Sequence, residues 1–117
     1  IKLLRDAPDD FLVLSGDDDL AMPQVAIGMD GVISVAANAF PKEFSAMVRL
    51  AAEGNISEAV KINNKLFEAY ELLFVENNPA GVKAFMHENG LLENVLRLPL
   101  LPLSDAIHQK IKNYLAG

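Results

Sequence analysis

The chain has 117 residues, enough for one domain, of which 51% are hydrophobic. Its net charge of −6, without any run of Lys or Arg, excludes nucleic acid and anionic membranes as main partners. The absence of cysteine excludes disulfides, thiolate metal sites and cysteine nucleophiles. No apolar run approaches the roughly 18 residues of a membrane span. We therefore expect a cytoplasmic protein with a sizeable hydrophobic core.

The first residues resemble the end of an amphipathic helix, Ile1–Arg5, followed by a turn at Asp6–Asp10, where Pro8 breaks the helix. The chain begins with Ile rather than Met. We expect that residues upstream have been removed by processing or truncation.

The most informative stretch lies between Phe11 and Asn38. Phe11–Leu14 and Val32–Val35 are short, wholly apolar runs, which are typical of strands covered on both faces in parallel sheets. A short helix is predicted over Leu20–Ile27, and as a crossover it would make the two strands parallel. The small polar clusters that follow each strand would then lie side by side at the carboxyl ends, where open α/β sheets and barrels place their chemistry.

The acidic cluster Asp17–Asp19 has two interpretations. The favoured one is capping of the next helix at the rim of a polar pocket. A metal site is the weaker alternative, because hard cations need more converging oxygen ligands. Gly16 allows a close approach to the backbone that a side chain would block.

The rest of the chain is predicted to be helical. A helix begins at Pro41 with the apolar stripe Phe44, Met47, Val48 and Ala51, and ends at Gly54-Asn55. Further helices run from a Ser57 cap to about Phe74, from an Asn78 cap to Gly90, and from a Ser104 cap to the end. Between the last two, Arg97–Leu103 is expected to be extended because of its prolines.

The isolated side chains that could be reactive are predicted to have ordinary structural roles. Lys83 is predicted on a helix as a solvated or salt-bridged lysine, and His87 and His108 as lone surface histidines. Ser34 is predicted to be a turn or pocket hydroxyl, since no Ser-His-Asp arrangement is present. Two parallel strands alone would leave both outer edges unpaired. We therefore expect a piece of a larger α/β domain, or edges that pair with another chain.

Three motifs in this order, SGDD (15–18), GVISV-x-AN (31–38) and RLPL-x-PLS (97–104), together with LFVENNPAGVK (73–83), resemble the dihydrodipicolinate synthase family. That family belongs to the class I aldolases, a superfamily that includes N-acetylneuraminate lyase. The resemblance covers essentially the whole chain. It implies the C-terminal part of a (β/α)8 TIM barrel: residues 1–53 would be the last βα units, with the seventh and eighth strands, and residues 54–117 a helical C-terminal extension.

The resemblance also implies a lyase of lysine and diaminopimelate biosynthesis. Pyruvate would form a Schiff base with a barrel lysine and condense with aspartate semialdehyde, without any further cofactor or metal. The imine lysine and the relay tyrosine would lie upstream of Ile1, so this chain alone is expected to be inactive. Gly16 and Asp17 match the loop that lines the aldehyde pocket, and Ile33 matches the residue whose carbonyl faces the imine lysine. Members commonly form homotetramers, and many have Pro in place of Gly81, a departure expected to affect loop stiffness.

Two alternatives remain open. One is a non-enzymatic helical assembly module of barrel ancestry that uses its apolar strand edges. The other is part of a sugar-acid aldolase such as N-acetylneuraminate lyase, which shares the imine chemistry and differs in the second substrate.

Overall fold

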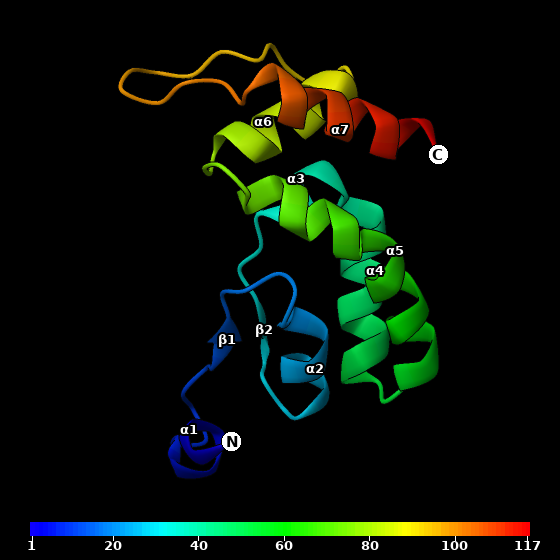
Figure 1. Ribbon diagram of the computed structural model, residues 1–117. Helices are drawn as coiled ribbons and strands as arrows, with labels where there is room; N and C mark the ends of the chain where they lie inside the picture. The colour runs from blue at the N-terminus through cyan, green and yellow to red at the C-terminus, as the bar shows by residue number, and fades with distance from the viewer. The chain divides into compact units, whose positions relative to one another are not determined.

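The computed structural model describes all 117 residues, as seven helices and two short strands (Figure 1). In chain order they are α1 Lys2–Asp6, β1 Leu14–Ser15, α2 Ala21–Ala26, β2 Gly31–Val32, α3 Ala36–Ala39, α4 Pro41–Ala52, α5 Ile56–Phe74, α6 Ala80–Glu88 and α7 Asp105–Ala116. None of the helices combines the length and apolar character that crossing a bilayer requires. Two compact units divide the chain, Ile1–Lys65 and Leu66–Gly117, and α5 crosses their boundary. The predicted division after residue 53, which follows the barrel, stays a prediction.

The sheet of the N-terminal unit is a parallel pair, as predicted. Leu14 lies opposite Gly31 and Ser15 opposite Val32, and α2 is the crossover between them (Figure 1). Asp30, just before β2, makes two hydrogen bonds with Val13, just before β1. Its N–H donates to the Val13 carbonyl at 2.9 Å, and its carboxylate accepts from the Val13 N–H at 2.8 Å. The mixture of parallel strands and helices confirms the α/β pattern.

The strands are shorter and more exposed than predicted. Val13 and Ser15 are buried, whereas the alternate residues Leu12 and Leu14 are exposed, which is the pattern of a strand covered on one face only. Leu12 is 68% exposed and Ile33 73%. The expectation of coverage on both faces is therefore wrong for this chain. Each strand has a single neighbour, and α2 packs against one side of the pair.

The helices α2, α3 and α4 build the core of the N-terminal unit. Pro41 stands at the first turn of α4, where its missing N–H costs no hydrogen bond. Phe44, Met47 and Ala51 are buried along one face, so the predicted stripe is confirmed, with Val48 half-buried at its margin.

The C-terminal unit pairs α6 with α7. Phe85 and Ile111 are fully buried, and the Phe85 and Tyr114 rings meet edge to face at a centroid distance of 5.8 Å. Ser104 caps α7 as predicted, because its hydroxyl accepts from the Ile107 N–H at 3.4 Å.

Other predicted caps are wrong. No side chain caps α2, which begins after Leu20, so Asp17–Asp19 do not have that role. Pro79 precedes α6, and Asn78 supplies no capping bond. Ser57 lies inside α5, whose first turn closes from the Ala59 N–H to the Asn55 carbonyl at 3.1 Å. In each case a backbone turn begins the helix one to three residues away from the best capping side chain.

The segment Arg97–Leu103 also differs from its prediction. It is interrupted by a turn at Leu98–Pro99, where the peptide bond is cis and the Leu100 N–H donates to the Arg97 carbonyl at 3.0 Å. The prediction considered only the restriction that each proline places on itself and on the residue before it, and not the backbone hydrogen bond that closes this turn.

Candidate functional site

The loops that follow β1 and β2 lie side by side at the carboxyl ends of the strands. The Ile33 N–H donates to the Ser15 carbonyl at 2.8 Å, which continues the ladder one step beyond the last strand pair. The two polar clusters are thus brought together, as the parallel arrangement predicts.

Asp18 connects these two loops directly. Its Oδ2 accepts from the Ala36 N–H at 2.8 Å, at the start of α3, and the side chain is only 4% exposed. Its Oδ1 is buried without a hydrogen-bond partner. Asp18 therefore holds the loop after β2 to the loop after β1. Sequence reasoning did not separate it from its acidic neighbours, although the N–H groups of the small-residue turn Ala36-Ala37 need an acceptor.

Two serine hydroxyls shape the same loops. The Ser15 hydroxyl donates to the Asp17 carbonyl at 3.2 Å and accepts from the Asp17 N–H at 3.4 Å. The Ser34 hydroxyl accepts from the Ala37 N–H at 2.9 Å. Ser34 is thus a turn hydroxyl, as predicted, and neither serine is arranged as a nucleophile.

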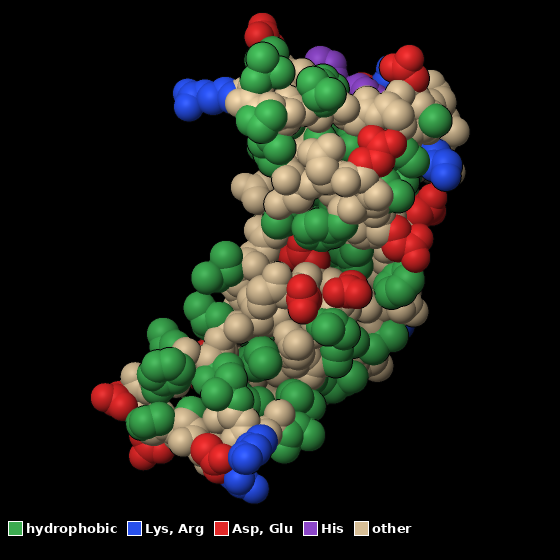
Figure 2. Space-filling model, turned by 60° about the vertical axis from the view of Figure 1, so that its left-hand side comes forward, with side chains coloured by type: hydrophobic (Ala, Val, Ile, Leu, Met, Phe, Trp, Pro, Cys, Tyr) green, Lys and Arg blue, Asp and Glu red, His purple; other side chains and the backbone are tan.

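The three predicted site residues all border open space. A Cβ added to Gly16 would meet no atom within 4 Å. Asp17 is exposed, and so is Ile33, whose backbone N–H is nevertheless fixed by Ser15. Figure 2 shows hydrophobic side chains and carboxylates intermingled on the exposed surface. The structure therefore leaves these three residues accessible to a ligand, and their roles stay predictions.

The site lacks a recognisable metal centre. The structure brings no group of three or more His, Cys, Asp or Glu residues together in a way that could hold an ion. Among Asp17–Asp19, only Asp18 turns into the protein.

Lys83 lies on α6, as predicted, and not at a strand end. Its ammonium donates to the Val95 carbonyl at 2.6 Å, and the residue is half-buried, not fully solvated. This environment supplies no apolar burial that would free the amine for imine formation.

The histidines differ from their prediction. His108 is not alone, because its Nε2 lies 2.7 Å from Glu88 Oε1, and Lys112 Nζ is 3.8 Å from the same oxygen. The hydrogen bond between His108 and Glu88 lowers the pKa of the Glu88 carboxyl below its ordinary value. The pair joins α6 to α7 across 20 residues of sequence. No local spacing pattern would have shown it.

A second carboxylate of this unit is also held by hydrogen bonds. Both the hydroxyl and the N–H of Ser104 donate to the Glu76 carboxylate. These two hydrogen bonds lower the pKa of Glu76, and the bond from the hydroxyl has the larger effect. Glu76 thereby fixes the residue that caps α7.

Comparison with known proteins gives one consistent result. The family model of the dihydrodipicolinate synthetase family matches residues 1–116. The 4-hydroxy-tetrahydrodipicolinate synthase of Azobacteroides pseudotrichonymphae is 48% identical over 113 residues, which are 97% of this chain and 38% of that protein.

Solved structures agree with the sequence match. The dihydrodipicolinate synthase of Aquifex aeolicus superposes with a TM-score of 0.93 at 37% identity, covering 98% of this chain and 39% of its own. The chloride-inhibited dihydrodipicolinate synthase of Acinetobacter baumannii, complexed with pyruvate, superposes with a TM-score of 0.86 at 39% identity. The match covers 91% of this chain and 36% of that one. The chain thus spans about 38% of the length of the curated relatives it matches.

Proposed function

Because the chain belongs to the dihydrodipicolinate synthetase family, we propose that it is part of a class I aldolase that condenses pyruvate with aspartate semialdehyde. The observation that carries this proposal is the match of residues 1–116 to the family, with 48% identity to a curated synthase. The ending Arg97–Ser104, which resembles the synthase more closely than the sugar-acid lyases, favours the synthase. A homotetramer in the cytoplasm is the proposed state of the whole enzyme.

We propose that β1 and β2 are the seventh and eighth strands of a (β/α)8 barrel. The parallel register, the crossover α2 and the exposed outer side chains Leu12 and Leu14 support this assignment. Residues 1–53 would then be the last βα units, and residues 54–117 the helical extension. In such barrels the reaction takes place at the carboxyl ends of the strands, where the loops of Gly16 and Ile33 meet here.

The proposed chemistry divides between this chain and the rest of the enzyme. A barrel lysine outside the chain would attack the keto carbon of pyruvate and lose water to form an imine, whose enamine then attacks the aldehyde. The Ile33 carbonyl would face that lysine, and Gly16 with Asp17 would line the aldehyde pocket. Asp18 would act by position only, since its bond to Ala36 joins the two loops. Neither metal nor organic cofactor is needed.

Borohydride trapping tests this proposal. The full-length enzyme is incubated with pyruvate and borohydride, digested, and searched by mass spectrometry for the reduced adduct. We expect one labelled lysine, outside residues 1–117, and none at Lys83. Labelling of Lys83 would overturn the assignment, and absence of any label would favour a non-enzymatic assembly module. Aspartate semialdehyde and N-acetylneuraminate, assayed in parallel, distinguish the synthase from the sugar-acid aldolase.

The pocket roles are tested by Gly16→Val. Since the position is open, the variant should fold normally, but its side chain would occupy the proposed aldehyde pocket. We expect the KM for aspartate semialdehyde to rise by about tenfold while the KM for pyruvate changes by less than about twofold. An equal rise of both values, or of neither, would contradict the pocket assignment.

A further inference from the structure

An open pocket of about 370 Å³ lies in the C-terminal unit, between α6 and the loop that follows it. Five residues line it: Pro79, Lys83, Leu96, Arg97 and Leu100. Its volume falls within the range of small-molecule sites. The roles proposed above use none of these residues.

Two hydrogen bonds hold the wall of this pocket. The Lys83 ammonium donates to the Val95 carbonyl at 2.6 Å and ties the loop to α6. The Leu100 N–H donates to the Arg97 carbonyl at 3.0 Å and closes the turn that carries both side chains. The loop is therefore held in place before any ligand arrives, which lowers the entropy cost of binding.

The polar part of the pocket is positively charged. Lys83 and Arg97 contribute two cations, and the lining contains no carboxylate. The Arg97 guanidinium is exposed and makes no hydrogen bond or ion pair in the structure. Lys83 uses one of its three N–H groups on Val95 and has two left. In a chain of net charge −6, the pocket is therefore a local concentration of positive charge.

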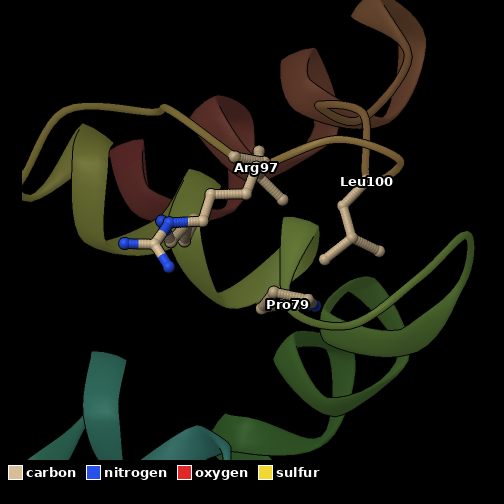
Figure 3. A pocket seen from close by; sticks show the side chains of 5 residues that line it. Pro79, Arg97 and Leu100 are labelled. Atoms are coloured by element: carbon tan, nitrogen blue, oxygen red, sulfur yellow. The ribbon is translucent and has the colours of Figure 1, made fainter.

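The rest of the pocket is apolar and lies apart from the guanidinium. In Figure 3, Leu100 points from the loop toward Pro79, whereas the Arg97 guanidinium lies on the other side, away from both. Leu96 adds a third apolar side chain to the lining. The Arg97 guanidinium thus lies at one side of the pocket, and Leu100 with Pro79 at the other.

We propose that this pocket binds a small amphipathic carboxylate. The planar fork of Arg97 matches a carboxylate in two parallel hydrogen bonds, and Lys83 adds a second charge. An alkyl or aryl group of the same ligand lies between Pro79, Leu96 and Leu100, where it is removed from water. The site is independent of the proposed aldolase reaction.

Calorimetric titration of the full-length protein with butyrate, hexanoate and hexanamide tests the proposal. Each added methylene should tighten binding about two- to fourfold, so hexanoate should bind more tightly than butyrate. The gain per methylene is modest because the pocket is open and buries the alkyl chain only in part. Hexanamide, which lacks the charge, should bind about tenfold more weakly than hexanoate.

Matched variants assign the binding to this pocket. Arg97→Gln should weaken hexanoate binding about tenfold, whereas Arg49→Gln, which removes the exposed arginine of α4, should change it by less than about twofold. Leu100→Ala should reduce the dependence on chain length, because Pro79 and Leu96 remain, while butyrate binding persists. Circular dichroism checks that each variant is folded.

Three results would overturn the proposal. The first is hexanoate binding that survives Arg97→Gln unchanged. The second is equal affinity for hexanoate and hexanamide, which would leave only an apolar surface. The third is inorganic phosphate that binds more tightly than hexanoate and depends on Arg97, which would mean a simple anion site without use for the apolar side chains.

Discussion

Asp18 shows how one side chain can position a whole loop. Three aspartates follow each other after β1, yet Asp17 and Asp19 are exposed and Asp18 is 4% exposed. Its Oδ2 satisfies the Ala36 N–H, which begins the short helix after β2. The backbone of Ile33 and Ser34 lies between that anchor and the ladder. Its geometry therefore depends on a residue that does not itself line the open side of the loops.

Replacing Asp18 by Ala should destabilise the protein. The variant loses the acceptor and leaves the Ala36 N–H unpaired in a buried place. We expect the free energy of unfolding, measured by urea titration, to fall by about 1–3 kcal/mol.

Asp19→Ala is the matched control for this variant. Asp19 is exposed and its carboxylate makes no hydrogen bond, so the change should stay within about 0.5 kcal/mol. Equal effects of the two substitutions would mean that Asp18 contributes nothing through its bond to Ala36.

Gly81 belongs to a close helix contact, not to a flexible loop. It stands in the first turn of α6, and a Cβ there would overlap the Leu73 carbonyl of α5, with the carbonyl carbon at 2.6 Å. The expectation that this departure from the family's usual Pro concerns loop stiffness is therefore wrong. The two helices approach so closely here because Gly has no side chain.

Gly81→Ala should destabilise the contact between α5 and α6. The clash is with backbone atoms, which cannot move aside as the end of a side chain can. We expect a loss of about 2–3 kcal/mol in urea unfolding. Gly90→Ala is a useful comparison, because Gly90 has a positive φ of 71° and open space, so its cost arises from strain alone, about 1 kcal/mol. A smaller loss for Gly81→Ala than for Gly90→Ala would contradict the close contact.

The bond between Glu88 and His108 joins α6 to α7 and should make stability depend on pH. The hydrogen bond from His108 lowers the pKa of Glu88 in the folded protein. The stabilisation is therefore fully present above the ordinary pKa of Glu, which applies to the unfolded chain. It is lost as the pH falls through the lowered pKa of the folded state.

Glu88→Gln isolates this contribution. At pH 7 the variant should be less stable than the parent by about 1 kcal/mol, since Glu88 is partly exposed and its bond is charge-assisted. In urea titrations the difference should be present at pH 7 and should disappear in acid, below the pKa values of Glu88 in both the unfolded and the folded state. A difference that persists in acid would mean that packing, and not the charge, explains the loss.

The N-terminal unit exposes apolar strand edges that a folded barrel would cover. Phe11, Leu12 and Ile33 are 60%, 68% and 73% exposed, next to a ladder with only two strands. Exposed strands of this kind pair readily with other chains. These exposed side chains agree with the expectation from the sequence that the strands lack neighbours. They also agree with the finding that the chain spans about 38% of the length of its curated relatives.

Residues 1–117, expressed alone, should self-associate through these edges. We expect light scattering after gel filtration to give a mass that rises with concentration. Leu12→Lys should reduce this association, because a charge beside the edge strand β1 opposes pairing. Leu101→Lys, at a side chain with a similar exposure of 62% in the C-terminal unit, should have less effect. Equal effects of both variants would indicate general hydrophobic association instead of strand pairing.

Local physics was sufficient for the parts of this protein that depend on neighbouring residues. The stripe of α4, the Ser104 cap and the parallel pair joined by α2 all follow from periodicity, capping chemistry and the handedness of crossovers. The juxtaposition of the two loops at the carboxyl ends of the strands follows from the same reasoning.

Tertiary packing decided the rest. It selected Asp18 among three adjacent carboxylates, joined His108 to Glu88 across 20 residues, and brought α5 onto Gly81. It also left β1 covered on one face only, where the apolar run had suggested two. A repeating pattern reports which face of an element is apolar. The path of the whole chain decides which atoms pack against this face. It also decides which hydrogen-bond partner each buried donor and acceptor finds.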